Sequence, residues 1–316
     1  MRKLLIVLIL ALPLAKASDG QQIVMNSMYM FNDFAINPAV AGTKNFSPIT
    51  IGFRRQWLGI REAPVAQHVS YHGHVGANVG AGGYLYNDVA GATRRTGIMG
   101  AMSMQFATTY NTRISFGIAG SFSQYVLDRE KLFTEEPNDP TVENYGTNML
   151  VPDIAAGLHW YGNKHHIGIS AYNLIQAKTD LFDLITPVTN TLDRTIYING
   201  SYLIERDRRS KFSLEPSVLL RLMFNAPLQF DVNLRAIFDH QYWIGASYRF
   251  QDAISIMAGF ELGFFGFGYA YDINTSALQS FNSGSHEIIL IFRTNKGASE
   301  KLKWSNRNRV YECPAF

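Results

Sequence analysis

The chain has 316 residues, of which 28 are Lys or Arg, 25 are Asp or Glu and 13% are aromatic. Three of the cations precede residue 18, so the remainder is close to neutral and holds no concentrated basic patch of the kind that nucleic-acid binding needs. The only cysteine is Cys313, which excludes an intramolecular disulfide.

The first 17 residues have the pattern of an export signal. Arg2 and Lys3 precede an apolar run over 4–14, and Ala15 and Ala17 frame a small-x-small cleavage site. This run is well short of the ~20 residues that a membrane-spanning helix needs. We therefore expect a cleavable signal peptide over 1–17 and an exported protein. Because no other stretch offers an uninterrupted apolar run of that length, a helical inner-membrane transporter is excluded.

The next segment, 18–45, fits no strand pattern. It contains the turn formers Asn37-Pro38 and Ala41-Gly42, which favour an ordered but non-strand structure. We expect an N-terminal lead-in that is a candidate plug for the domain that follows.

Two-residue alternation dominates the sequence from residue 46 to residue 294. Between Leu228 and Phe238, apolar side chains alternate with Gln229, Asp231, Asn233 and Arg235. One face of such a strand suits lipid and the other suits water. The pattern predicts about 14 strands, near 46–56, 64–75, 78–87, 92–109, 112–126, 151–160, 164–173, 193–205, 210–222, 227–239, 240–250, 253–262, 264–273 and 284–294.

The connections between these strands alternate in length. If the N-terminus is periplasmic, the two longest, 127–150 and 174–192, both fall outside, while the periplasmic turns are short. A soluble β-sandwich or propeller would show the same alternation of side chains. Aromatic residues near strand ends, among them Trp57, Trp160 and Trp243, favour the interfacial girdles of a barrel.

The predicted fold class is thus all-β, a transmembrane antiparallel up-and-down β-barrel in the outer membrane of a Gram-negative cell. The barrel would span 46–294 and contact outer-membrane lipid, and a basic periplasmic tail would follow over 295–316.

One strand carries a row of polar side chains of the types that bind metals or catalyse hydrolysis. His68, Ser70, His72 and His74 share a strand face with neighbours ~7 Å apart, which would suit a metal site or a Ser/His hydrolase. No carboxylate partner is identifiable, so a polar strip facing the lumen is the favoured interpretation.

The long connection 127–150 holds a group of carboxylates. Glu135, Glu136 and Asp139 could recruit calcium or a partner, although charge runs are usually solvated surface. The sequence contains none of the common phosphate-loop, nucleophile-elbow or zinc-protease motifs. We expect no cofactor and no enzymatic activity.

Several short motifs resemble one protein family. Tyr29-Met30-Phe31-Asn32, the stretch from Ala35 to Gly42, and the stretch from Arg54 to Ile60 with Ala63-Pro64 are similar to the opening of the PorP/SprF family of type IX secretion system membrane proteins. Further similar motifs are Tyr86-Asn87-Asp88 with Gly91, Val151-Pro152-Asp153 with Gly157, and Tyr269-x-Tyr271-Asp272 followed by Gly284 to Ile288. The resemblance spans nearly the whole chain after the signal.

The resemblance implies an outer-membrane barrel of the Bacteroidetes lineage that supports export of cargo carrying a C-terminal sorting domain. In some members the cargo includes surface adhesins used in gliding motility. The implied partners are the cargo itself and the periplasmic ring and translocon proteins of the secretion system.

Three functions follow as hypotheses. The first is a secretion component that binds cargo or machinery, the second is a passive or hydrophobic-solute channel, and the third is an outer-membrane hydrolase built on the His68–His74 strip. A simple pore needs neither the lead-in nor the tail, which favours the first. The candidate partner-binding residues are Tyr29, Asn32, Asn37, Pro38, Gly42, Arg55, Trp57, Glu135, Glu136 and Asp139.

Overall fold

The computed structural model describes residues 25–109, 111–128, 131, 148–177, 191–205, 210–224 and 226–294. Every strand pairs antiparallel with its neighbours along one continuous sheet. The strands are β1 (Ser47–Arg55), β2 (Val65–His74), β3 (Val79–Ala90), β4 (Thr93–Ala107), β5 (Thr112–Leu127), β6 (Asn148–Gly162), β7 (His165–Tyr172), β8 (Thr195–Tyr202), β9 (Ile204–Glu205), β10 (Phe212–Met223), β11 (Ala226–Phe238), β12 (Tyr242–Arg249), β13 (Ala253–Leu262), β14 (Phe265–Asn274) and β15 (Ser285–Thr294).

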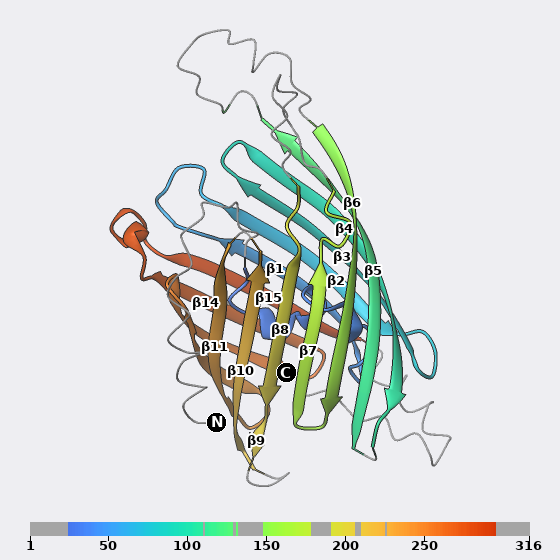
Figure 1. Ribbon diagram of the computed structural model, residues 1–316. Helices are drawn as coiled ribbons and strands as arrows, with labels where there is room; N and C mark the ends of the chain where they lie inside the picture. Colours follow the sequence, from blue (N-terminus) through green and yellow to red (C-terminus); the bar gives the residue numbers. More distant parts are fainter. Residues whose placement is uncertain are drawn as a thin grey trace, which may run out of the picture.

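The sheet closes on itself into a barrel (Figure 1). The first and last strands, β1 and β15, pair with Thr50 opposite Ile291, and β10 pairs with β11. The short β9 continues β8 beyond Leu203, so the two segments form one strand of the wall. The 15 strand segments therefore make 14 wall strands, which confirms the predicted fold.

Apolar side chains cover the outside of the barrel and polar ones face the lumen. Along β11, Val232 and Leu234 are 47% and 51% exposed, whereas Asp231, Asn233 and Arg235 are buried. A soluble sandwich would bury its apolar face, so that interpretation is wrong. Several buried luminal charges are paired across strands, as Arg249 Nε is with Asp231 Oδ1 at 3.1 Å, which is the arrangement that a low-dielectric interior requires.

The two ends of the barrel differ in the length of their connections. The two longest, 128–147 and 173–194, lie at the same end, which we call the long-loop end. At the opposite, short-turn end the longest connection is 206–211. Outer-membrane barrels place long loops outside and tight turns in the periplasm. The long-loop end is therefore the external one.

Two strands extend three residues beyond their predicted boundaries. The end of β3 is Ala90 instead of residue 87, and β6 begins at Asn148 instead of residue 151. In both places the ladder to the neighbouring strand continues, with Ala90 opposite Thr93 and Val126 opposite Asn148. Cross-strand pairing thus extends the wall through residues whose local chemistry resembles a turn. Among the described residues, no helix has the length and hydrophobicity needed to cross a bilayer.

Candidate functional site

The lumen is occupied by the segment that precedes β1, which we call the luminal segment (residues 25–45; blue in Figure 1). It folds into three single-turn 3-10 helices, η2 (Tyr29–Phe31), η3 (Asp33–Ala35) and η4 (Pro38–Val40). Most of its residues are buried, although none of them belongs to a strand. The segment therefore packs as the core of the barrel.

A charged cluster holds the start of the luminal segment near the long-loop end. The Ser27 backbone N–H donates to Glu287 Oε2 at 2.7 Å, and the Ser27 hydroxyl donates to Asp272 Oδ2 at 2.8 Å. Arg54 bridges the two carboxylates, with contacts of 2.8 Å to Glu287 and 2.5 Å to Asp272. All four side chains are buried. The paired charges from β1, β14 and β15 thus bind the backbone of the segment.

An aromatic contact fixes the next turn. The ring of Phe31 lies 4.7 Å from that of Trp243, measured between centroids, and the guanidinium of Arg235 lies 4.8 Å from the Phe31 centroid. Met28 packs in the same apolar cluster and is 1% exposed. Burial of such side chains contributes roughly 1.5–3 kcal/mol each. The segment is therefore held by packing as well as by charge.

Wall side chains donate hydrogen bonds to successive backbone carbonyls of the segment. Ser115 donates to Ala39 O at 2.7 Å, and Ser103 donates to Ala41 O at 2.6 Å. The remaining donors of this kind are Tyr172 to Ala35 O, Ser170 to Ile36 O and Gln105 to Gly42 O. These contacts satisfy carbonyls that no regular secondary structure would pair. The polar strips on the inner wall thus form a matched set of donors.

Wall glycines make room for the backbone of the segment. A Cβ on Gly117 would lie 2.3 Å from Ala39 N, and one on Gly80 would lie 2.1 Å from Ala41 O. Both distances are shorter than real Cβ contacts, so any larger residue would push the segment away. The turn that follows η4 uses Gly42 at φ +66°, a left-handed conformation that favours glycine.

An ion pair closes the segment on itself. Lys44 Nζ lies 3.0 Å from Asp33 Oδ1, and both side chains are buried. Burial alone would raise the pKa of the Asp33 carboxyl, but the Lys44 ammonium together with nearby histidines outweighs it and the pKa falls to about 2. The carboxylate therefore stays ionised at every physiological pH, and the pair joins the end of the segment to its middle.

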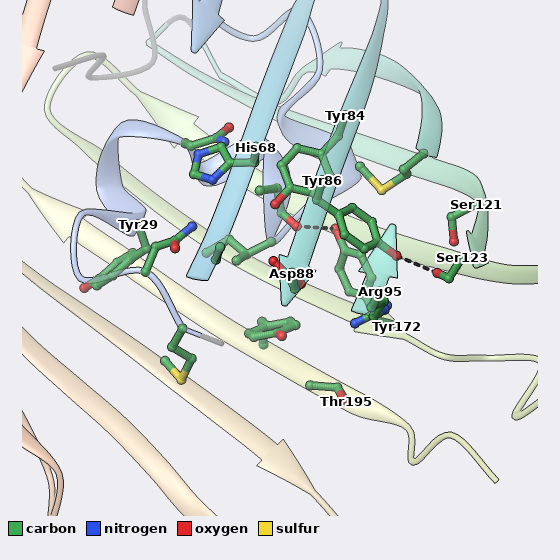
Figure 2. Close-up of a pocket in the computed structure, with 18 of the residues that line it drawn as sticks. Tyr29, His68, Tyr84, Tyr86, Asp88, Arg95, Ser121, Ser123, Tyr172 and Thr195 are labelled. Carbon is green, nitrogen blue, oxygen red and sulfur yellow. Dashed lines mark hydrogen bonds between the residues drawn. The ribbon is translucent and has the colours of Figure 1, made fainter. Parts of the chain in front are cut away.

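A cavity of about 130 Å³ lies in the lumen, between the luminal segment and the half of the wall nearest the long-loop end (Figure 2). Its lining combines tyrosines with charged and hydroxyl side chains from several strands. The residues labelled in Figure 2 are Tyr29, His68, Tyr84, Tyr86, Asp88, Arg95, Ser121, Ser123, Tyr172 and Thr195. A chamber of this chemistry suits a ligand with both flat apolar surface and hydrogen-bonding groups.

Two features make this cavity a candidate binding site. The Arg95 guanidinium lies 4.9 Å from the Tyr86 ring centroid, and the Tyr86 hydroxyl is 2.5 Å from Ser123 Oγ, so the side chains are held in place. In addition, Asn32 Nδ2 and His68 Nε2 are buried and have no hydrogen-bond partner within the described part of the chain. Buried polar atoms are normally satisfied, so these two are available to a ligand.

The predicted partner-binding residues are distributed over distant places. Tyr29, Asn32, Asn37, Pro38 and Gly42 belong to the luminal segment and are buried, and Asn37 Nδ2 donates to Leu158 O at 3.0 Å. A folded partner could touch them only if the segment left the lumen. Their direct role in partner binding stays a prediction.

The remaining candidates lie elsewhere. Arg55 points outward at the external end of β1, and the Trp57 backbone N–H donates to Ser285 Oγ at 3.1 Å in the following loop. Glu135, Glu136 and Asp139 lie outside the described residues.

The histidine strip faces the lumen, with its side chains in separate surroundings. Ser70 donates to Asn32 Oδ1 at 2.9 Å, and His72 Nδ1 accepts from Gly42 N at 3.2 Å. His68 lies against Tyr84 with ring centroids 5.8 Å apart. In the described part of the chain, no group of three or more His, Cys, Asp or Glu side chains is arranged to hold a metal ion. Two of the four residues thus bind the luminal segment.

The cavity itself was not foreseen from the sequence. Its signal was the alternation of Tyr84, Tyr86 and Asp88, which in a barrel strand all face the lumen. What the sequence could not supply was the opposite wall, where Tyr172 and Thr195 arrive from β7 and β8.

Solved structures that share the barrel architecture are distant in sequence. The CymD monoaromatic hydrocarbon channel is 12% identical, with a TM-score of 0.49 over 87% of this chain and 93% of that one. The Pseudomonas putida toluene transporter TodX is 8% identical, with a TM-score of 0.47 over 88% and 95% of the two chains. The Acinetobacter baumannii outer membrane protein Omp33 is 8% identical, with a TM-score of 0.45 over 80% and 99%.

No curated protein matches the sequence. One family, described as type IX secretion system membrane protein PorP/SprF, matches residues 18–292, which is nearly the whole chain. The closed barrel with its apolar outer face agrees with a membrane protein of that family, and its place is the outer membrane. The chain belongs to the PorP/SprF family of type IX secretion system membrane proteins.

Proposed function

We propose that this barrel is a binding component of type IX secretion, which engages cargo or machinery at its external mouth, and that it does not serve as an open pore. Membership of the family supports the link to secretion. The observation that carries the proposal is the luminal segment, which occupies the space that a solute channel would need to keep free.

The contacts of the segment favour a static plug. Its start is bound to Arg54, Asp272 and Glu287, and its end is covalently continuous with β1. Hydrogen bonds to the wall fix the residues between these points. A solute would have to displace several of these contacts together, and each contributes about 0.5–1.5 kcal/mol. Spontaneous opening is therefore rare, which disfavours the passive or hydrophobic-solute channel.

The external mouth offers a surface suited to a protein partner. The wall strands that anchor both long connections end there, and Tyr172 and Thr195, which flank the second connection, line the cavity. Asp88, Arg95 and the available Asn32 amide give the cavity both charge signs and free hydrogen-bonding capacity. We propose that a short peptide segment of the partner, such as part of a cargo sorting domain, enters it. A stable barrel carrying one polar aromatic pocket fits docking better than catalysis, so no enzymatic step is assigned.

The test is an export assay in the native host. Cells lacking the gene should retain proteins with C-terminal sorting domains in the periplasm, as measured by quantitative proteomics of periplasm and cell surface. Complementation with Asp88→Asn should restore export only in part, whereas Lys211→Gln, which removes an exposed charge at the short-turn end, should restore it fully. If export is intact without the gene and uptake of small solutes falls, the channel hypothesis replaces this proposal.

A further inference from the structure

The outer wall carries an apolar groove of about 500 Å³ across β1, β2 and β3. Its sides are Ile51, Phe53, Val69 and Leu85, which point outward and are 38–52% exposed. The wall here faces lipid, because the same faces of these strands are apolar and the opposite faces line the lumen. An acyl chain is therefore the natural occupant of the groove.

A polar cluster lies at the external end of this groove. Gln67, Asn87 and Thr96 are opposite one another on β2, β3 and β4, and all three line the groove. Asn87 Oδ1 accepts from Thr96 Oγ1 at 3.0 Å and from Arg94 Nε at 2.8 Å. Hydrogen-bonded amides beside an arginine are unusual on a lipid-facing wall, where polar groups are costly.

The Arg94 guanidinium has capacity left for a ligand. It is exposed, and within the described residues no carboxylate forms an ion pair with it. Because Asn87 holds Nε, the guanidinium is oriented, and among the described residues no carboxylate pairs with its other nitrogens. An arginine fixed in this way is preorganised to bind a phosphate.

A second exposed arginine lies in the same row of the sheet. Arg55 is opposite Val65 on β2, Val65 is opposite Val89 on β3, and Val89 is opposite Arg94 on β4. Three strand spacings of ~4.8 Å separate the two arginines by about 14 Å. That span matches a disaccharide that carries a phosphate at each end.

The level of the cluster in the membrane fits a headgroup. Asn87 lies eight residues along β3 from Val79, and Thr96 lies eleven residues along β4 from Ala107, each counted from the short-turn end. With ~3.3 Å per residue and a tilt of ~40°, Thr96 is about 28 Å above Ala107. Asn87, which pairs with Thr96, lies at nearly the same level, because β3 begins at Val79, opposite Met104, three residues above Ala107. The apolar band of such barrels is ~25 Å tall. The cluster therefore lies at the outer boundary of the hydrocarbon.

We propose that the outer wall of β1–β4 binds one bis-phosphorylated saccharolipid of the outer leaflet, of the lipid A class. Arg55 and Arg94 contact its two phosphates, Gln67 and Asn87 contact the sugar or the amide groups, and one acyl chain lies in the groove. This site is distinct from the proposed peptide site, because it lies on the outer face of the wall and the tyrosine-lined cavity lies in the lumen.

The test uses the full-length purified protein in detergent, titrated with purified bis-phosphorylated lipid A and followed by native mass spectrometry. We expect one tightly bound molecule, with weaker binding of monophosphorylated lipid A and of phosphatidylglycerol, and no competition by inorganic phosphate at the same concentration. Because each variant loses charge-assisted hydrogen bonds to a phosphate, we expect the affinity for lipid A to fall by about tenfold or more in Arg94→Gln and in Arg55→Gln. The control Lys211→Gln removes one positive charge at the short-turn end and should leave binding unchanged.

Integrity of each barrel is checked by its shift in electrophoretic mobility on heating. If Arg94→Gln does not fold, Arg94→Lys is used in its place. This variant keeps the charge but loses the planar guanidinium, and its affinity for lipid A should be several-fold lower than that of the wild type. Equal affinity for lipid A and phosphatidylglycerol, or unchanged affinity in both arginine variants, would overturn the proposal. The assignment to the lipid A class would also be wrong if binding depended on the two arginines but was similar for all anionic lipids.

Discussion

Replacement of one wall glycine by alanine should loosen the luminal segment. In Gly117→Ala the added Cβ would lie 2.3 Å from Ala39 N and 2.5 Å from the carbonyl carbon of Pro38. Comfortable contacts begin near 3.4 Å, so η4 must retreat by about 1 Å, and the neighbouring bond from Ser115 to Ala39 O must lengthen. Overpacking of this kind costs ~1–3 kcal/mol, which corresponds to a rise of about 5- to 150-fold in the population with the segment displaced.

The assay is single-channel recording of the full-length protein in planar bilayers. The wild type should be closed nearly all the time, and Gly117→Ala should open more often or for longer. Gly120→Ala is the matched control, because Gly120 is on the same strand, faces outward, and has no atom of a neighbouring residue within 4 Å of an added Cβ. Identical recordings from the two alanine variants would refute the assignment of the segment as the closure of the lumen.

Three further predictions concern stability, measured by denaturant unfolding in detergent. Arg54→Gln removes the cation that contacts both Asp272 and Glu287 and leaves Asp272 only the influence of Arg249, so the free energy of unfolding should fall by about 3–5 kcal/mol. The difference between wild type and Asp33→Asn should be constant from about pH 8 to pH 5. It should shrink as the pH falls from about 4 toward 2, because the lowered pKa of Asp33 makes its pairing with Lys44 a stabilisation that acid removes. Ile118→Arg places a charge on the lipid-facing surface, where Ile118 is 67% exposed, and should cost about 2–4 kcal/mol if the site is near the bilayer midplane.

A different stability result would refute each of these three predictions. A loss below about 1 kcal/mol in Arg54→Gln would mean that the luminal charges are solvated like surface ion pairs. A stability difference for Asp33→Asn that disappears near neutral pH would mean that the carboxylate is not paired in the folded protein. An Ile118→Arg variant as stable as wild type would mean that this face of β5 contacts water.

The sequence by itself determined the wall of the barrel. Side-chain alternation has a period of two in any strand, so the residue pattern alone predicts that Asp231 and Arg235 lie on the face opposite Val232, and their burial confirms it. The alternation of long and short connections also identified the two ends of the barrel, because connection lengths follow directly from where the strands lie in the sequence. Strand ends were less certain, because the extension of β3 to Ala90 depends on its partner Thr93 and not on the residues of β3 alone.

Only the tertiary structure decided what fills the barrel and where a ligand could bind. Nothing local in Asn37-Pro38 or Ala41-Gly42 shows that the carbonyls of this stretch meet serines of β4 and β5, since those contacts join residues more than sixty positions apart. The cavity and the outer groove depend in the same way on curvature and register, which bring separate strands side by side. Strand periodicity depends only on neighbouring residues in the sequence. The interior depends on contacts between distant residues, which form only when the barrel closes around the luminal segment.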